Sequence, residues 1–169
     1  MSFYRKVGWS EGYVRKYVGI ACALTELHRF EEAMRVLQKG LKKHPFSAAL
    51  FHEMGNYYHA RMEYDRSYKW FRRAAEADPK EPMYRFGVAN AACCLSQFEE
   101  GISIYQSLVN KYPRNGLFRE LLGWSLFDTG YTEEAMKEFK SAILLKGSGI
   151  DAYMGLYFAA VIWAFKLKL

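Results

Sequence analysis

His52 and Glu53 begin the segment HEMGN, the part of the chain that comes nearest to a known catalytic pattern. The zinc-protease signature places two histidines four residues apart on one helix, with the glutamate after the first histidine as general base. Here the second ligand position holds Asn56. The next histidine, His59, would lie about 10 Å from His52 along a helix. Two histidines at that separation do not share a metal ion, so we predict no metal site.

The other reactive residue types form no catalytic arrangement either. Cys22, Cys93 and Cys94 have no metal-ligand spacing, and an odd number of cysteines does not suggest a disulfide framework. No glycine-rich phosphate loop follows a predicted strand, and no serine or cysteine is paired with a base by its spacing. We therefore predict a non-enzymatic protein with no cofactor, in a reducing compartment, the cytoplasm.

The elements that carry these residues recur at a constant spacing. Similar segments begin at Glu31, Asp65, Glu99 and Glu133, so each starts the same distance after the one before it. Small residues stand 12 positions before the third residue of each segment, and proline stands 12 positions after it in the first three, with Gly147 in the fourth. The small residues are Ala21, Gly55, Ala89 and Gly123, and the prolines are Pro45, Pro79 and Pro113. Such a period indicates stacked helix pairs, in which small residues let two helices cross closely.

Over residues 14–149 the chain resembles the tetratricopeptide repeat family. The first repeat matches the family pattern at Tyr17, Ile20, Ala21, Leu24, Ala33, Leu37, Gly40 and Pro45. The second matches at Phe51, Met54, Gly55, Tyr58, Ser67, Phe71, Ala74 and Pro79. The third and fourth repeats depart from it at Arg85, Ala92, Gly101 and Arg119.

The resemblance implies an all-α fold, a right-handed superhelical solenoid of helix-turn-helix repeats. It implies four repeats, residues 14–47, 48–81, 82–115 and 116–149. An N-terminal extension, residues 1–13, precedes them, and a capping or partial-repeat helix, residues 150–169, follows.

In this family, positions 2, 5, 9 and 12 of each first helix form the wall of a binding groove. Carried onto this chain, the resemblance implies a groove that includes Arg15, His52, Asn56, His59, Met83, Phe86, Asn90, Leu117, Glu120, Trp124 and Phe127. Asparagine amides can bind the backbone of an extended peptide, and aromatic side chains can anchor its apolar residues. We therefore expect a protein or peptide partner, with Asn56 and Asn90 as backbone contacts. An alternative is that the C-terminal helix buries the aromatic residues.

Other classes of partner fit less well. The net charge is +6, but the basic residues fall on second helices and repeat ends, where a solvated outer face explains them, so we predict no nucleic-acid binding. The family's carboxylate clamp for chaperone tails is matched only at Asn56. The stretch Asp78 to Pro82 and the chain length give a weak similarity to type III secretion chaperones.

The C-terminal segment from Ala152 to Phe165 is apolar throughout. A membrane-spanning helix needs about 20 apolar residues, and a run of about 10–14 more often forms a buried helix, so we predict a helix that covers the last repeat. A cap with a polar outer face would be typical, and this segment is apolar nearly all round. Two alternatives therefore stay open for residues 152–169: attachment to a membrane as an adaptor, and docking of another subunit in a homo-oligomer.

Overall fold

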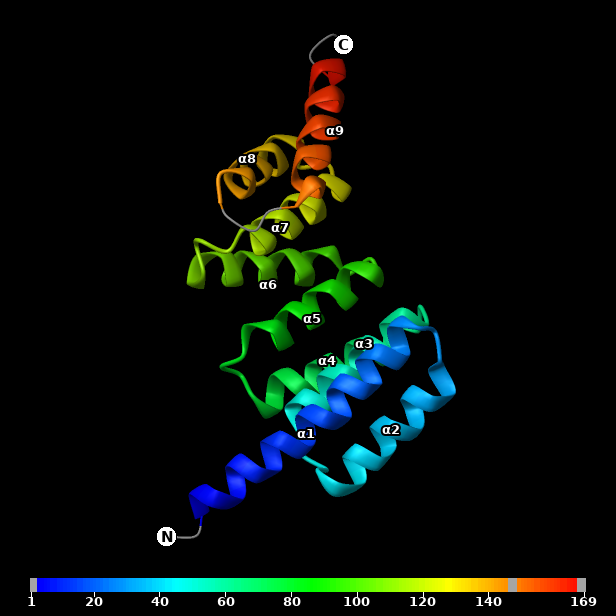
Figure 1. The fold of residues 1–169 in the computed structure, drawn as a ribbon. Helices are drawn as coiled ribbons and strands as arrows, with labels where there is room; N and C mark the ends of the chain where they lie inside the picture. Colours follow the sequence, from blue (N-terminus) through cyan, green and yellow to red (C-terminus); the bar gives the residue numbers. More distant parts are fainter. Residues whose placement is uncertain (1–2, 146–148, 167–169) are drawn as a thin grey trace. The chain divides into compact units, whose positions relative to one another are not determined.

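The computed structural model describes residues 3–145 and 149–166, with side chains from residue 12 onward, and in these residues all regular structure is helical (Figure 1). The helices are α1 (Phe3–Glu26), α2 (Phe30–Lys43), α3 (Ala48–Ala60), α4 (Tyr64–Ala77), α5 (Pro82–Cys94), α6 (Phe98–Lys111), α7 (Gly116–Asp128), α8 (Thr132–Ile143) and α9 (Ile150–Lys166). The prediction of an all-α fold is confirmed. Gly147, which stands at the proline position of the fourth segment, and residues 167–169 lie outside the described residues.

The chain divides into two compact units, Met1–Ala91 and Ala92–Leu169, whose boundary falls within α5. In the first unit, α1 pairs with α2 and α3 with α4. In the second, α7 pairs with α8, and α9 packs mainly on α8. The helices α3, α5 and α7 begin at equal intervals along the chain, in step with the period of the sequence. The helix α1 runs without a break from Phe3 across the boundary predicted between residues 13 and 14.

The turn inside each helix pair is a left-handed cap. His28, Met62 and Ser96 have φ values of 56°, 60° and 61°, and Gly130, at the equivalent place, has 84°. In each turn the N–H of the following residue donates to the carbonyl five positions earlier, as from Arg29 to Leu24 at 2.8 Å. This is the Schellman arrangement that satisfies the last carbonyls of a helix. Only the fourth turn uses glycine, the residue with no steric penalty there.

Close helix crossings depend on glycine beside one large ring. In the first unit, a Cβ on Gly55 would collide with the ring of Phe71, and a Cβ on Gly87 would lie 2.6 Å from it. The hydroxyl of Ser67, also buried, donates to the carbonyl of Gly55 at 2.9 Å and links α4 to α3. These contacts support the prediction that Gly55 permits a close crossing.

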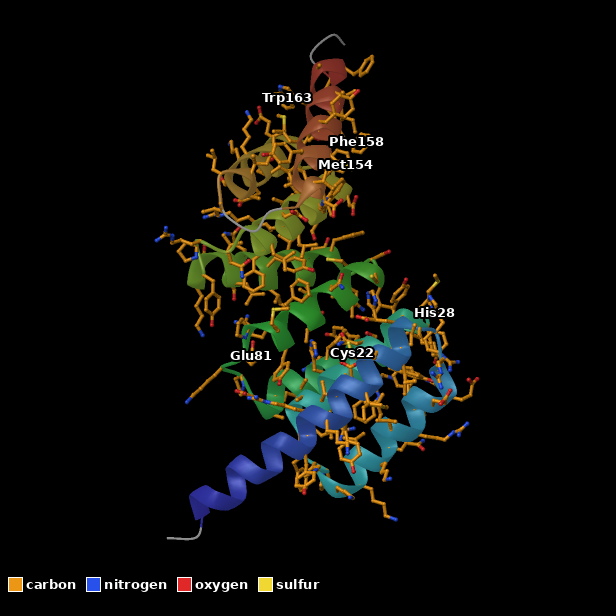
Figure 2. The ribbon with its side chains drawn as sticks, viewed as in Figure 1. Cys22, His28, Glu81, Met154, Phe158 and Trp163 are labelled. Carbon is orange, nitrogen blue, oxygen red and sulfur yellow. The ribbon has the colours of Figure 1, made fainter. Side chains whose placement is uncertain are left out.

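The last helix, α9, buries only one side. Ala152, Gly155 and Ala159 are buried, whereas Tyr157 is 66% exposed and Phe165 67% exposed. Figure 2 shows Met154 and Phe158 on α9, one helical turn apart. Within residues 3–145 and 149–166, no helix is both long enough and apolar enough to cross a membrane.

Candidate functional site

A cavity of about 410 Å³ opens in the first unit among α1, α3 and α5. It is lined by Cys22, Thr25, Glu26, His28, His52, Glu53, Asn56, His59, Ala60, Phe71, Met83, Phe86, Gly87 and Asn90. Cys22 and His28 mark its boundary at α1 and the turn that follows (Figure 2). We call it the α1–α3–α5 cavity.

This cavity brings together six of the residues that the sequence assigned to the groove. They are His52, Asn56, His59, Met83, Phe86 and Asn90. They meet because each occupies a corresponding position on one of two adjacent first helices, α3 and α5. Arg15 is exposed on α1 and is not part of the cavity lining.

The groove residues assigned to the second unit do not line the α1–α3–α5 cavity. Leu117 borders a separate cavity of about 590 Å³, formed by residues 111–117 in the turn before α7 and at its start. Glu120 is only 6% exposed, and its Oε2 accepts from the N–H of Gly149 at 3.2 Å. Trp124 and Phe127 pack with Phe139 and Ala159 in the core of α7, α8 and α9.

The centroid of the Trp124 ring lies 5.2 Å from that of Phe139. Trp124 and Phe127 are partly buried in this core, to which α9 contributes Ala159. Their part in binding stays a prediction.

Glu53 is the most unusual group in the α1–α3–α5 cavity. It is 3% exposed, and its Oε2 accepts from Nδ2 of Asn56 at 3.0 Å. Its Oε1 and the Oγ1 of Thr25 are buried and have no hydrogen-bond partner among the described residues. Burial, with a smaller contribution from the nearby charge of Glu26, raises the pKa of Glu53 to about 7, although the Asn56 hydrogen bond opposes the shift.

Two histidines of the cavity are held neutral by their surroundings. The His52 ring lies 5.1 Å from that of Phe71 and 5.2 Å from that of Tyr84, between centroids. Burial lowers the pKa of His52, and it also lowers the pKa of His59. Neutral imidazole offers one acceptor nitrogen and one donor, so these rings add hydrogen-bonding capacity without positive charge at neutral pH.

The two asparagines already contact groups within the first unit. Nδ2 of Asn56 lies 3.4 Å from Nδ1 of His52, in addition to its bond to Glu53. Nδ2 of Asn90 lies 3.4 Å from Nε2 of His59. The amide nitrogens therefore fix the orientation of cavity groups, and a direct bond to a peptide backbone stays a prediction.

Sequence reasoning missed Glu26, His28, Glu53, Ala60, Phe71 and Gly87. Glu53 carried a usable signal, because it lies three residues after Leu50 and four before Tyr57, both buried on α3. A carboxylate on an apolar helix face is uncommon unless it has a partner or a role. Phe71 carried no such signal, since its contribution depends on how α4 packs against α3.

No group of three or more His, Cys, Asp or Glu side chains with the geometry of a metal site occurs in the part of the chain that the structure describes. Cys22, Cys93 and Cys94 form no disulfide within the described residues. Burial raises the pKa of Cys22, Cys93 and Cys94, so their thiols stay protonated and weakly nucleophilic at neutral pH.

Family models described as tetratricopeptide repeat match residues 18–82 and residues 119–148. The chain belongs to the tetratricopeptide repeat family.

Solved structures of this fold resemble the chain at low sequence identity. A chain of MamA from Desulfovibrio magneticus RS-1 that begins at its residue 41 is 18% identical, with a TM-score of 0.76 over 89% of this chain and 85% of that MamA chain. PilF from Pseudomonas aeruginosa is 15% identical, with a TM-score of 0.82 over 94% of this chain and 72% of PilF. YrrB, described as a tetratricopeptide repeat protein with an unusual peptide-binding site, is 19% identical, with a TM-score of 0.68 over 98% of this chain and 84% of YrrB. At these identities the likeness shows the fold.

Proposed function

We propose that this protein is a non-enzymatic interaction module that binds a segment of a partner protein over the α1–α3–α5 cavity. The observation that carries the proposal is the convergence of six groove positions on one cavity of about 410 Å³. The cavity combines apolar contact surface at Met83 and Phe86 with hydrogen-bonding groups at Asn56 and Asn90. Sites of this kind bind apolar side chains and fix their orientation through a few polar contacts. The description of YrrB as a peptide-binding protein of the same fold gives further support.

Selection of peptides from a random phage-displayed library against the purified chain tests this proposal. Selected peptides are then titrated against Met83→Ala, because Met83 is 38% exposed at the cavity and its truncation removes contact area without opening a buried core. We expect affinity to fall by about three- to tenfold. Phe46→Ala is the matched control, since Phe46 is 88% exposed and lies outside the cavity lining. Failure to select any peptide, or equal binding by the two variants, would contradict the proposal.

A second candidate function, self-association through α9, is favoured by the free side of that helix. Between Asp151 and Lys166 the helix has no charged residue, and Tyr153, Tyr157, Phe158 and other large side chains are exposed. We propose a second copy of the chain as the occupant. In an antiparallel two-fold pairing of α9 with itself, each Asp151 would lie near the Lys166 of the other copy. This charge complementarity is the reason for preferring a second copy to another partner.

Sedimentation across a range of protein concentrations tests self-association. We expect the chain to dimerise and Tyr157→Lys to shift it to monomer, because the substitution places a charge on the exposed apolar side. Leu144→Lys adds the same charge at a position that is 86% exposed and outside α9, and it should still dimerise. A monomer at all concentrations would exclude this candidate. Flotation with lipid vesicles by a monomeric chain would favour the membrane-adaptor alternative instead.

A further inference from the structure

The α1–α3–α5 cavity has an acidic lining. Glu26 and Glu53 contribute carboxyl groups, and none of the lining residues is a lysine or an arginine. This contrasts with the chain as a whole, whose net charge is +6. The local charge therefore has the opposite sign to the overall charge, and it favours a cation in this place.

Two buried oxygens in the lining have no hydrogen-bond partner within the described part of the chain. Glu53 Oε1 and Thr25 Oγ1 make no hydrogen bond with any described residue. A buried polar atom without a partner is energetically unfavourable, so native structures rarely leave one unless a ligand or ordered water meets it. Both atoms can accept a hydrogen bond, and the ionised carboxylate can only accept, so a hydrogen-bond donor is a component that could satisfy both.

The other groups of the lining suit a cation with an alkyl stem. His52 and His59 are neutral at neutral pH and oppose no positive charge. Phe71 and Phe86 supply aromatic rings, and Met83 supplies apolar surface for methylene groups. An anionic side chain would meet Glu26 and Glu53 instead, so an acidic guest is disfavoured.

We propose that the α1–α3–α5 cavity receives a basic side chain, lysine or arginine, from the bound segment of the partner protein. This inference rests on the proposed function and specifies the chemistry of the partner. The cationic group donates to Glu53 and Thr25, while its methylene groups contact Met83 and Phe86. Binding stabilises the ionised form of Glu53, so complex formation releases protons near neutral pH.

The affinity of the cavity for a cation should depend on pH, and the groups with shifted pKa values that face the cavity do not oppose one another in this dependence. As pH falls from 8 to 6, Glu53 on α3 gains a proton, because its pKa is raised to about 7. His52 and His59 on the same helix also gain protons at lower pH, since their pKa values are below the usual one. On α1, the pKa of Cys22 is raised, so it stays neutral, and α5 contributes no ionisable lining residue. Each of these protonations removes a negative charge or adds a positive charge at the cavity. The affinity for a cation should therefore decrease as the pH decreases.

The first test uses n-butylammonium as a mimic of the lysine side chain and n-butanol as its uncharged counterpart. We expect n-butylammonium to shift the NMR resonance of the Glu53 carboxyl carbon and to lower its apparent pKa, with no comparable effect of n-butanol. Glu53→Gln keeps the size of the side chain and removes the charge, and it should abolish the response of the cavity resonances, including Thr25. Equal responses to the two probes would show an apolar void and overturn the proposal.

The second test uses the peptides selected on phage. We expect them to contain a lysine or arginine whose replacement by norleucine reduces affinity by about tenfold. Glu53→Gln should reduce the affinity of the unmodified peptide to a similar extent. Glu31→Gln makes the same change in net charge at an exposed position outside the cavity, and it should leave affinity unchanged.

The two proposals fail in different ways. Peptides that depend on Met83 but bind equally to Glu53→Gln would overturn the basic-side-chain proposal and leave the proposed function standing. If no peptide is selected, the proposed function fails, and the comparison of n-butylammonium with n-butanol still decides whether the cavity prefers a cation.

Discussion

Gly155 of α9 lies against the ring of Phe139 of α8 so closely that a Cβ at Gly155 would overlap the ring. Gly87 of α5 stands in the same relation to Phe71 of α4, two repeats earlier in the chain. Thus α9 packs on α8 as the first helix of one repeat packs on the second helix of the repeat before it.

Gly155→Ala should destabilise the second unit by about 1–3 kcal/mol, because the added methyl group forces the Phe139 ring or α9 to move. Urea denaturation followed by circular dichroism measures the change. Gly19→Ala is the control: Gly19 lies within α1, and a Cβ added there would meet no atom within 4 Å. Alanine there should stabilise by up to about 1 kcal/mol, since it favours helix more than glycine does. Stabilisation by Gly155→Ala would show that the crossing tolerates a methyl group.

Met62→Gly should stabilise the first unit by about 0.5–1 kcal/mol, because Met62 adopts a φ of 60°, in a region that carries a steric penalty for residues with a Cβ. Met62 is exposed, so little packing is lost. The reverse substitution, Gly130→Ala, places a Cβ at a φ of 84° and should destabilise by about 1 kcal/mol. Thermal unfolding of both variants measures these changes in stability. If both substitutions stabilised the protein, or both destabilised it, the assignment of backbone strain to the turns would be wrong.

Glu53→Gln should stabilise the free protein by about 1–3 kcal/mol at pH 8 and much less at pH 4.5. The pKa of Glu53 is raised by burial to about 7 in the folded chain, so folding favours its protonated form. The wild-type chain therefore loses this stability as pH rises from the unfolded pKa, near 4.5, through 7, whereas glutamine has no charge to bury. Urea denaturation across this pH range gives the difference between the two proteins. A difference that does not change with pH would contradict the raised pKa.

Removal of Arg119 and Glu138 singly and together should give a coupling energy of about 0.5–1 kcal/mol that decreases with added salt. Nη1 of Arg119 lies 2.9 Å from Oε2 of Glu138, and both side chains are about one-fifth exposed. The Arg72 and Glu76 pair is more than half exposed on each side, at 3.4 Å, and should show a smaller coupling. Double-mutant cycles measured by denaturation compare the pairs, and equal couplings would count against the effect of burial.

Arg119 also shows how the structure accounts for a departure from the family pattern. The sequence has arginine where the pattern has a large apolar residue. In the structure its guanidinium bonds Glu138 of α8 and the carbonyl of Pro113, at 3.2 Å. The position still links α7 to α8, through an ion pair in place of an apolar contact.

The helices and their spacing could be predicted from the sequence, because both depend on local patterns. Apolar residues at helical spacing, small residues such as Gly55, and the constant repeat period predict helix pairs without knowledge of any distant contact. The resemblance to the tetratricopeptide repeat family implied that six residues would face one region, because it assigns them to the groove wall: His52, Asn56, His59, Met83, Phe86 and Asn90.

The groups that surround the candidate site, and their charge, became known only from the packing of the helices. Glu53 became a buried carboxylate with a raised pKa because α1, α4 and α5 exclude water from around it, a result of packing between segments far apart in sequence. The family resemblance also assigned Trp124 to the exposed groove wall. In the structure Trp124 instead packs with Phe139 in the core that includes Ala159. Burial and desolvation depend on neighbours from other helices, and a local sequence pattern does not specify them.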